Sequence, residues 1–214
     1  MQIKHIIWDW NGTLFNDMWL CVDVINNLLQ KRNHPILSEI QYRNIFGFPV
    51  KDYYERAGFD FTHESFEEVG TEFIVEYNKR KEECVLFDEV LQILKTIKNS
   101  GITQSVLSAR EETSLKQELD YYKVSQFLNY SFGLNNHYAG SKVKLGKHLI
   151  SRLKLPTYNI LMIGDTVHDY ETAMMMEVNC ILIDKGHQTT EVLKKCKVPI
   201  LNSIGEVPDY LKNF

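Results

Sequence analysis

The chain has 214 residues, of which 44% are hydrophobic and 24% charged, and its formal net charge is −4. This composition is typical of a folded globular protein and excludes a disordered one, and the length suits one ordinary domain with a smaller domain or insertion attached. The sequence has no block of lysine and arginine, so we expect neither nucleic acid nor a membrane surface as a partner.

The apolar stretch within MQIKHIIWDW is too short for a signal peptide, and no segment approaches the roughly 18 apolar residues of a membrane span. We therefore expect a cytoplasmic protein. The cysteines are scattered and include no C-x-x-C pair, which favours reduced, buried thiols over a zinc site or a disulfide framework. They are Cys21, Cys84, Cys180 and Cys196.

Short apolar runs alternate along the chain with amphipathic segments of helical length, which is typical of an α/β fold. The runs are almost continuously hydrophobic, as expected of parallel strands that are covered on both faces. We therefore predict a Rossmann-like, doubly wound parallel sheet as the core. The predicted strands are 3–8, 102–108, 130–133, 159–164, 180–184 and 199–201.

More than ninety residues separate the first two predicted strands, which is far more than one crossover helix needs. Helical periodicity appears in three segments of this interval, and a fourth segment, ending just before Gly101, is the predicted crossover helix that returns to the core. We expect residues 16–86 to form an inserted α-helical cap, and 1–15 with 87–214 to form the core. The predicted helices are 18–31, 51–57, 63–81 and 88–99.

Polar residues stand where the predicted strands end. In HIIWDWNGTLFND, Asp9 follows the first strand, and Ser108 ends the second. IGDTVHD places Asp165 and Asp169 after the fourth strand, and Lys142 begins a predicted helix. Because ligands of parallel sheets gather at the carboxyl ends of the strands, near the point where the strand order reverses, we expect one common site there.

Several carboxylates in one cleft repel each other and raise each other's pKa values unless a cation lies among them. A hard divalent ion is implied, and Mg²⁺ fits because it takes oxygen ligands and is commonly held by one or two carboxylates plus a substrate phosphate. With such an ion present, Asp9 stays ionised and can attack phosphorus. Ser108 and Lys142 would bind phosphoryl oxygens. The pattern predicts a phosphoryl-transfer site.

Four segments match, in order, the motifs of one known family: DWNGTL, Ser108 in VLSAR, Lys142 and GDTVHD. They resemble the haloacid dehalogenase superfamily of phosphohydrolases, in its phosphoglycolate phosphatase-like branch. The predicted insert corresponds to the helical cap that this branch carries between its first two motifs, where it closes over the substrate. The match runs the length of the chain.

The resemblance implies a magnesium-dependent phosphatase that acts on a small phosphorylated metabolite, as a monomer or a homodimer. It implies that Asp9 attacks the substrate and that water later releases phosphate. It also implies that Mg²⁺ is held by Asp9, by the main-chain carbonyl of Asn11 and by Asp165. Asp169 either ligates the ion directly or supports the ligands around it.

Asn11 departs from the family pattern, since phosphatases and phosphomutases of the superfamily usually carry an aspartate there as the general acid and base. An amide can do neither, and such help is typically worth ~10² to 10⁴ in rate. We therefore expect a phosphatase that is slow or selective for its leaving group. The alternative is a phosphate-binding or regulatory protein with little turnover. The amide argues against a mutase, and the acidic set argues against a dehalogenase.

Other polar residues have simpler interpretations. A helix N-cap is the alternative for Ser108, and Lys144 and Lys147 suit a solvated helix face. His168 stands beside the predicted metal loop and could support it, whereas His187 suits ordinary hydrogen bonding. The segment RNIFGFPVKDYYERAG, 43–58, resembles the cap's specificity loop. Its basic residues either reach an acidic substrate group or lie in solvent; they are Arg43, Lys51 and Arg56.

Overall fold

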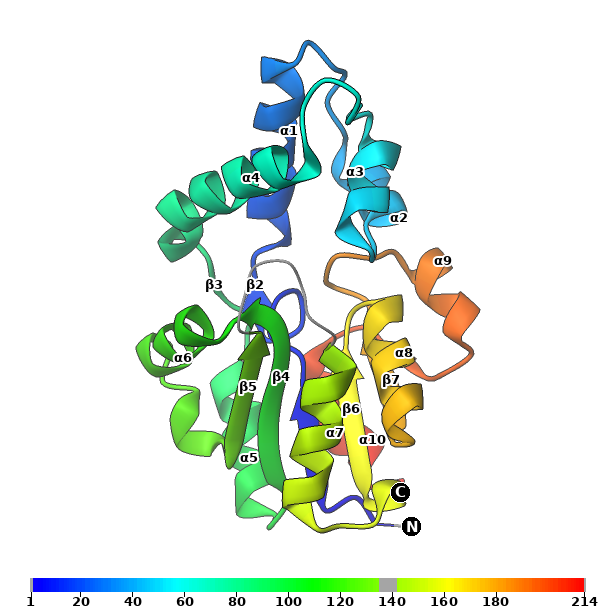
Figure 1. Ribbon diagram of the computed structural model, residues 1–214. Coiled ribbons are helices and arrows are strands. Elements are labelled where there is room, and N and C mark those ends of the chain that lie inside the picture. Colours follow the sequence, from blue (N-terminus) through cyan, green and yellow to red (C-terminus); the bar gives the residue numbers. More distant parts are fainter. Residues whose placement is uncertain (1, 135–141, 214) are drawn as a thin grey trace.

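A six-stranded parallel sheet forms the centre of the computed structural model, which describes residues 2–134 and 142–213 (Figure 1). The strand order is β5-β4-β1-β6-β7-β8, so the predicted doubly wound sheet is confirmed. All six predicted strands are present, and β4 continues three residues beyond its predicted end. Their bounds are β1 His5–Trp8, β4 Thr103–Glu111, β5 Tyr130–Leu134, β6 Ile160–Gly164, β7 Asn179–Ile183 and β8 Ile200–Leu201. Residues 1, 135–141 and 214 of the predicted core lie outside this description.

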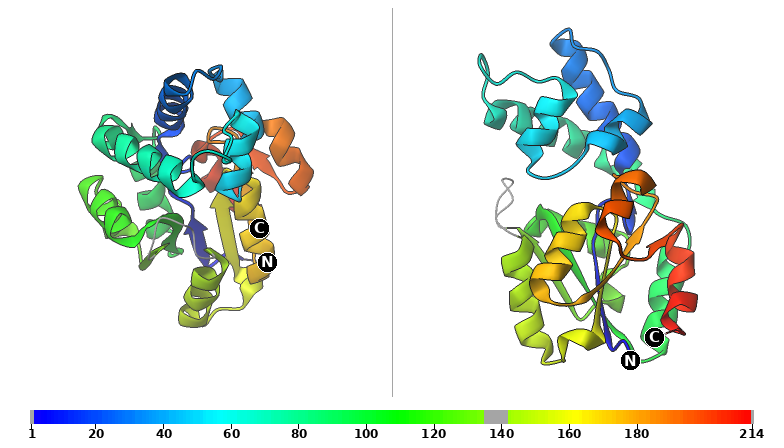
Figure 2. Two further views of the ribbon diagram at one scale, coloured as in Figure 1. Left: turned by 45° about the horizontal axis from the view of Figure 1, so that its top comes forward. Right: turned by 90° about the vertical axis from the view of Figure 1, so that its right-hand side faces the viewer.

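Helices cover both faces of the sheet (Figure 2). In β1, Ile6 and Trp8 share one hydrophobic cluster with Leu94, whereas Ile7 packs on the other face with Leu149. This alternation explains why the strands read as continuous apolar runs. The helices of this part are α5 Val90–Asn99, α6 Glu112–Tyr121, α7 Lys142–Leu153, α8 Val167–Met176, α9 Thr190–Leu193 and α10 Val207–Leu211.

The chain leaves the core through β2 and returns through β3, and these two short strands pair antiparallel. The helices between them lie beyond the carboxyl ends of the sheet strands (Figure 1). We call residues 16–86 the insert; its role as a cap remains a prediction. Its elements, with the two strands, are β2 Phe15–Asn16, α1 Met18–Lys31, α2 Glu39–Ile45, α3 Val50–Ala57, α4 Phe66–Arg80, the 3₁₀ turn Lys81–Glu83 and β3 Val85–Leu86.

Local signals fix the ends of the insert helices. Ser65 and Glu68 form a reciprocal capping box at the start of α4, and Gly58 ends α3 in the left-handed conformation, with φ of 111°. The sequence analysis did not predict α2, although Ser38 and Gln41 form the same kind of capping box there. The remaining 3₁₀ turns are Ser125–Phe127, Thr157–Asn159, Lys194–Cys196 and Ile204–Glu206. Within the described ranges, every helix is too short or too polar to cross a membrane.

Candidate active site

The site forms where β1, β4 and β6 end side by side. Trp8, the last residue of β1, pairs with Val106 of β4 and with Ile163 of β6. The next residue, Asp9, continues this register, because its N–H donates to the carbonyl of Ile163 at 2.8 Å. Asp9 therefore leaves the sheet between the ends of its two neighbouring strands, and its side chain is buried.

Lys142 brings together two of the predicted acids. Its ammonium nitrogen lies 2.5 Å from Oδ1 of Asp9 and 2.6 Å from Oδ1 of Asp169, and all three side chains are buried. Lys142 is the first residue of α7, whereas Asp169 stands in the first turn of α8. Two helix starts thus place an ammonium group against the end of β1.

Asp169 already has several hydrogen-bond donors. Its Oδ2 accepts from the hydroxyl of Thr166 at 2.7 Å and from the N–H groups of Thr166 and Asp165, at 3.0 and 3.2 Å. Thr166 in turn caps α8 through the N–H of Asp169, so the two residues form a capping box. These bonds and the ion pair with Lys142 favour a supporting role for Asp169.

Asp165 is held between two loops. Its Oδ2 accepts the N–H of His187 at 2.6 Å, and its Oδ1 accepts the hydroxyl of Thr13 at 3.1 Å. Gly12, with φ of 75°, and Gly186 both pack against this carboxylate, and a Cβ atom at either position would collide with it. Only glycine permits these two approaches.

Burial is the main influence on the acids of the site. It raises the pKa of Asp9 and of Asp165 well above the ordinary value, and for both residues the nearby charge of Asp169 adds to the effect. Burial opposes the charge of Lys142 as well, but Asp169 and Asp9 outweigh it and raise the pKa of Lys142. The three buried acids therefore share one lysine, which pairs with two of them, Asp9 and Asp169.

The residues present fit a magnesium ion. Carboxylate oxygens of Asp9, Asp165 and Asp169 all lie within 4.8 Å of one another, and every candidate ligand in this cluster is oxygen. Such a set suits a hard divalent cation rather than a soft metal. A second positive charge would also relieve the repulsion that raises the pKa values of Asp9 and Asp165.

Ser108 does not cap the helix that follows it, so the N-cap interpretation is wrong. The residue that caps α6 is Glu111, whose carboxylate accepts the N–H groups of Thr113 and Ser114. Ser108 lies inside β4, with its hydroxyl buried and accepting the N–H of Arg110 at 3.0 Å. Its hydroxyl hydrogen remains available for a ligand oxygen.

The side chain of Asn11 faces the insert. Its amide nitrogen donates to Oδ2 of Asp17 at 2.7 Å and to the hydroxyl of Tyr77 at 3.2 Å. Asp17 stands between β2 and α1, where the chain enters the insert, and Tyr77 belongs to α4. The sequence analysis did not single out either partner.

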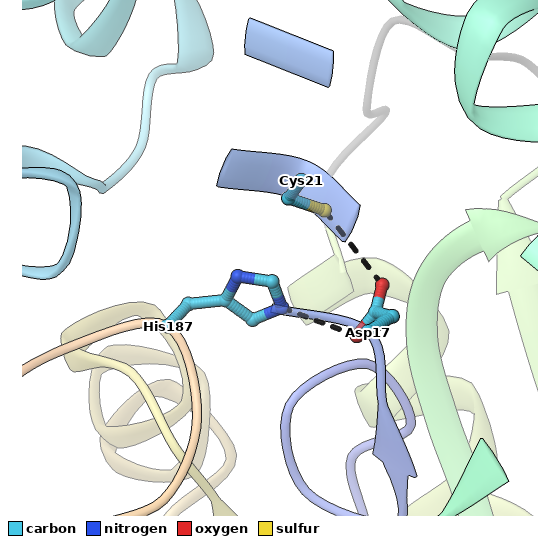
Figure 3. A group of neighbouring side chains, drawn as sticks. All are labelled: Asp17, Cys21 and His187. Carbon is cyan, nitrogen blue, oxygen red and sulfur yellow. Dashed lines mark hydrogen bonds and ion pairs between the residues drawn. The ribbon is translucent and has the colours of Figure 1, made fainter. Parts of the chain in front are cut away.

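Asp17, Cys21 and His187 form a buried group beside this contact (Figure 3). Nε2 of His187 lies 3.4 Å from Oδ1 of Asp17, and Nδ1 lies 2.8 Å from the hydroxyl of Tyr42 in α2. The thiol of Cys21 donates to Asp17 at 3.8 Å. Because both ring nitrogens and both carboxylate oxygens have partners, hydrogen bonding accounts for the group without a metal ion.

Of the basic residues singled out in the insert, Lys51 and Arg56 are exposed, as one of the two predicted alternatives had it, and only Arg43 differs. Arg43 neither lies in solvent nor is free for a substrate, since it bonds Asp184 at 3.1 Å and the carbonyl of Gln188 at 3.0 Å. Arg56 bonds the carbonyl of Ile45. These contacts are structural, and the one from Arg43 joins α2 to the core.

Other predicted side chains are placed as follows. His168 stacks on Phe48 of the insert, with ring centroids 4.4 Å apart, so it contacts the insert directly. Lys144 and Lys147 are exposed, as predicted for a solvated face. The ammonium group of Lys51 lies 5.8 Å above the ring of Phe61. All four cysteines are free and buried, as predicted.

Comparisons with known proteins identify the family and the fold of the chain. The model of the family described as haloacid dehalogenase-like hydrolase matches residues 6–183. The chain belongs to that family. A curated relative of this hydrolase, the tyrosine-protein kinase PtkA of Mycobacterium tuberculosis, is 20% identical over 206 residues, which cover 95% of this chain and 70% of the relative.

Solved structures share the fold at low identity. A predicted phosphatase from Clostridium acetobutylicum superposes with a TM-score of 0.82 at 18% identity and covers 100% of both chains. A predicted phosphoglycolate phosphatase from Haemophilus somnus gives a TM-score of 0.80 at 19% identity, covering 98% of each chain. The Rossmann-like core and the insert of this hydrolase therefore occur together in both proteins.

Proposed function

We propose that this hydrolase is a magnesium-dependent phosphatase that acts on a small phosphorylated metabolite, with Asp9 as the nucleophile. The observation that carries the proposal is the position of Asp9, which is buried at the end of β1 and paired with Lys142 beside Asp165 and Asp169. This constellation joins a nucleophile to groups that stabilise negative charge, as transfer of a phosphoryl group requires.

The reaction has two displacement steps at phosphorus. A carboxylate oxygen of Asp9 attacks, the bond from phosphorus to the leaving oxygen breaks, and the leaving oxygen takes a proton from water. Water then attacks phosphorus, the bond to Asp9 breaks, and phosphate leaves while solvent takes the proton. Lys142 lies where its charge holds Asp9 and a phosphoryl oxygen together, and Ser108 donates its hydroxyl hydrogen to another oxygen.

We propose that Mg²⁺ is held by Asp9, the main-chain carbonyl of Asn11 and Asp165. When bound, the ion supplies positive charge that offsets the charge of the carboxylates and of the phosphoryl group. Asp169 remains a candidate ligand, but its bonds favour a second task, which is to hold Lys142 in place. The insert would exclude water by lying over the strand ends, as a cap does.

Asn11 makes the proposed phosphatase selective for its leaving group. No proton is available from an amide, so a poor alkoxide leaving group gains no assistance from this residue. The side chain is also bonded to Asp17 and Tyr77. We propose that aryl and acyl phosphates react much faster than alkyl phosphates of similar size.

Phosphate release from a panel of phosphorylated metabolites, with Mg²⁺ and with EDTA, tests the proposal. We expect release from at least one class of metabolite that depends on Mg²⁺ and is lost in Asp9→Asn. Release that continues unchanged in EDTA would contradict the magnesium assignment.

A second candidate is a phosphate-binding or regulatory protein with little turnover. The observation that favours it is the amide of Asn11, which is tied to the insert and offers no proton. In this case isothermal titration would detect binding of a phosphorylated metabolite in the presence of Mg²⁺. The same metabolite would then release no phosphate.

A further inference from the structure

Asp17 uses its carboxylate in an unusual way for its position. It is the N-cap residue of α1, where an aspartate normally accepts an N–H from the first turn of its own helix. Asp17 makes no such bond. Its side chain is buried and faces the loop after β1 and helix α4 instead. Groups other than the end of α1 therefore determine the orientation of the Asp17 side chain.

The neighbours of Asp17 are all hydrogen-bond donors. Oδ2 accepts the amide of Asn11 at 2.7 Å and the hydroxyl of Tyr77 at 2.8 Å, while Oδ1 accepts the N–H of Gly12 at 3.1 Å and faces His187 at 3.4 Å. An ionised carboxylate can only accept, so it fixes the amide of Asn11 with its nitrogen toward Asp17. The nitrogen also donates to Tyr77, which closes a ring of three bonds.

The charge of Asp17 is stabilised where it lies. Its two oxygens accept three hydrogen bonds, from Asn11, Tyr77 and Gly12, and a ring nitrogen of His187 lies 3.4 Å from Oδ1. Position 11 therefore faces an anion, and a donor there is favoured over an acceptor.

We infer that Asp17 is a positioning residue that requires an amide at position 11 and holds this amide against Tyr77. The side chain at position 11 thereby stabilises the junction between the core and the insert and does not assist the nucleophile. This coupling rests on the contacts alone. Only its effect on catalysis rests on the proposed phosphatase function.

Through Tyr77, the contact between Asn11 and Asp17 involves both chain segments that connect the insert to the core. Asp17 lies where the chain leaves the core, and Tyr77 lies in the last turn of α4, just before the chain returns. The guanidinium of Arg110, which follows Ser108 in β4, lies 4.9 Å from the ring of Tyr77 and bonds Asn78 at 2.9 Å. The end of α4 is thus held between the two strand ends that carry the site.

An aspartate at position 11 would oppose this arrangement. In Asn11→Asp an acceptor replaces the donor that lies 2.7 Å from Asp17, so a bond is lost and two carboxylates repel. Exchanging the pair, by Asn11→Asp with Asp17→Asn, restores complementarity. The amide nitrogen at position 17 then donates to the carboxylate at position 11, and its oxygen still accepts the N–H of Gly12.

Thermal unfolding of the two single variants and the exchanged pair tests the coupling. We expect each single variant to lower Tm, and the exchanged pair to be more stable than either one. The matched control is Asn16→Asp with Asp17→Asn, which has the same composition and net charge as the exchanged pair but cannot remake the bond. It should show no recovery. Additive losses of Tm in the exchanged pair, or equal recovery in the control, would overturn the inference.

The dependence of rate on the leaving group gives a readout that stability alone does not move. We expect Asn11→Asp to react more evenly with aryl and alkyl phosphates, because its carboxyl is repelled from Asp17 and released toward the substrate. The exchanged pair should regain the steep dependence of the natural protein, since its carboxyl is held at position 17. Equal dependence in these two variants would show that Asp17 does not position the side chain. Absence of phosphate release from the natural protein would contradict the proposed function, and Tm would still decide the coupling.

Discussion

The hydroxyl of Tyr42 lies 2.8 Å from Nδ1 of His187, and this contact joins the insert to the loop that holds Asp165. Both side chains are buried. Removing the hydroxyl in Tyr42→Phe leaves a ring nitrogen of His187 without its partner, which costs about 1–3 kcal/mol. We expect urea unfolding to show a loss of this size. Tyr121→Phe is the control, because Tyr121 is 69% exposed; equal losses in the two variants would contradict the role of the contact.

Magnesium should change how stability depends on pH. Burial raises the pKa of Asp9 to about 8 and of Asp165 to about 6, from 3.8, so without metal the folded protein keeps protons that the unfolded chain has lost. The free energy of unfolding therefore falls as pH rises from about 4 to 8. Asp169, whose pKa is lowered despite burial because Lys142 stabilises its charge, loses its contribution only in more acidic solution.

Tm at pH 5 and pH 8, in EDTA and in Mg²⁺, tests this dependence. In EDTA we expect a lower Tm at pH 8 than at pH 5, and Mg²⁺ should raise Tm most at pH 8, because it binds the ionised acids of the folded state. Asp9→Asn should reduce the pH dependence in EDTA. A Tm in EDTA that rises with pH would contradict the burial of these acids, and a Tm indifferent to Mg²⁺ would contradict the metal assignment.

Arg43 should affect stability and substrate binding by holding the insert against the core. Arg43→Ala removes the bonds to Asp184 and to the carbonyl of Gln188, so we expect a loss of stability of about 1–2 kcal/mol and a higher KM for every substrate. Lys51→Ala is the comparison, since Lys51 is exposed and its ammonium group lies 5.8 Å from the centre of the Phe61 ring. If Arg43→Ala instead changed the order of preferred substrates without loss of stability, Arg43 would be a substrate-binding residue.

Asn11 predicts a steep dependence of the rate on the pKa of the leaving group. Without an internal acid, expulsion of an alkoxide is penalised far more than expulsion of a phenolate. Turnover of a series of aryl and alkyl phosphates by the natural protein measures this dependence. Similar rates across the series would show that another group supplies the proton, and the account of Asn11 would be wrong.

Most of the core could be predicted because its signals are local. Most strands are largely apolar runs, and Asp9 and Asp165 each follow a strand directly, so sheet topology alone brings these two acids together. The short elements α2, β2 and β3 escaped prediction, since seven or two residues give little periodicity.

The junction with the insert could not be predicted in the same way. Asp17 meets His187 from the far end of the chain, and Asn11 meets Tyr77 across the whole insert. The local sequences FND, which contains Asp17, and GHQ, which contains His187, do not indicate a partner so far away in the chain. Arg43 was misinterpreted for the same reason, because its acceptors lie in a distant loop.

The most direct test of the central claim is detection of phosphate on Asp9 during turnover. We would mix the protein with Mg²⁺ and an aryl phosphate, quench in acid, and measure the mass of the peptide that contains Asp9. The account predicts a phosphorylated fraction on Asp9 that is absent in EDTA and in Asp9→Asn, and that decays once the substrate is spent. Phosphate release by a protein whose Asp9 never becomes phosphorylated, or by Asp9→Asn at the natural rate, would contradict it.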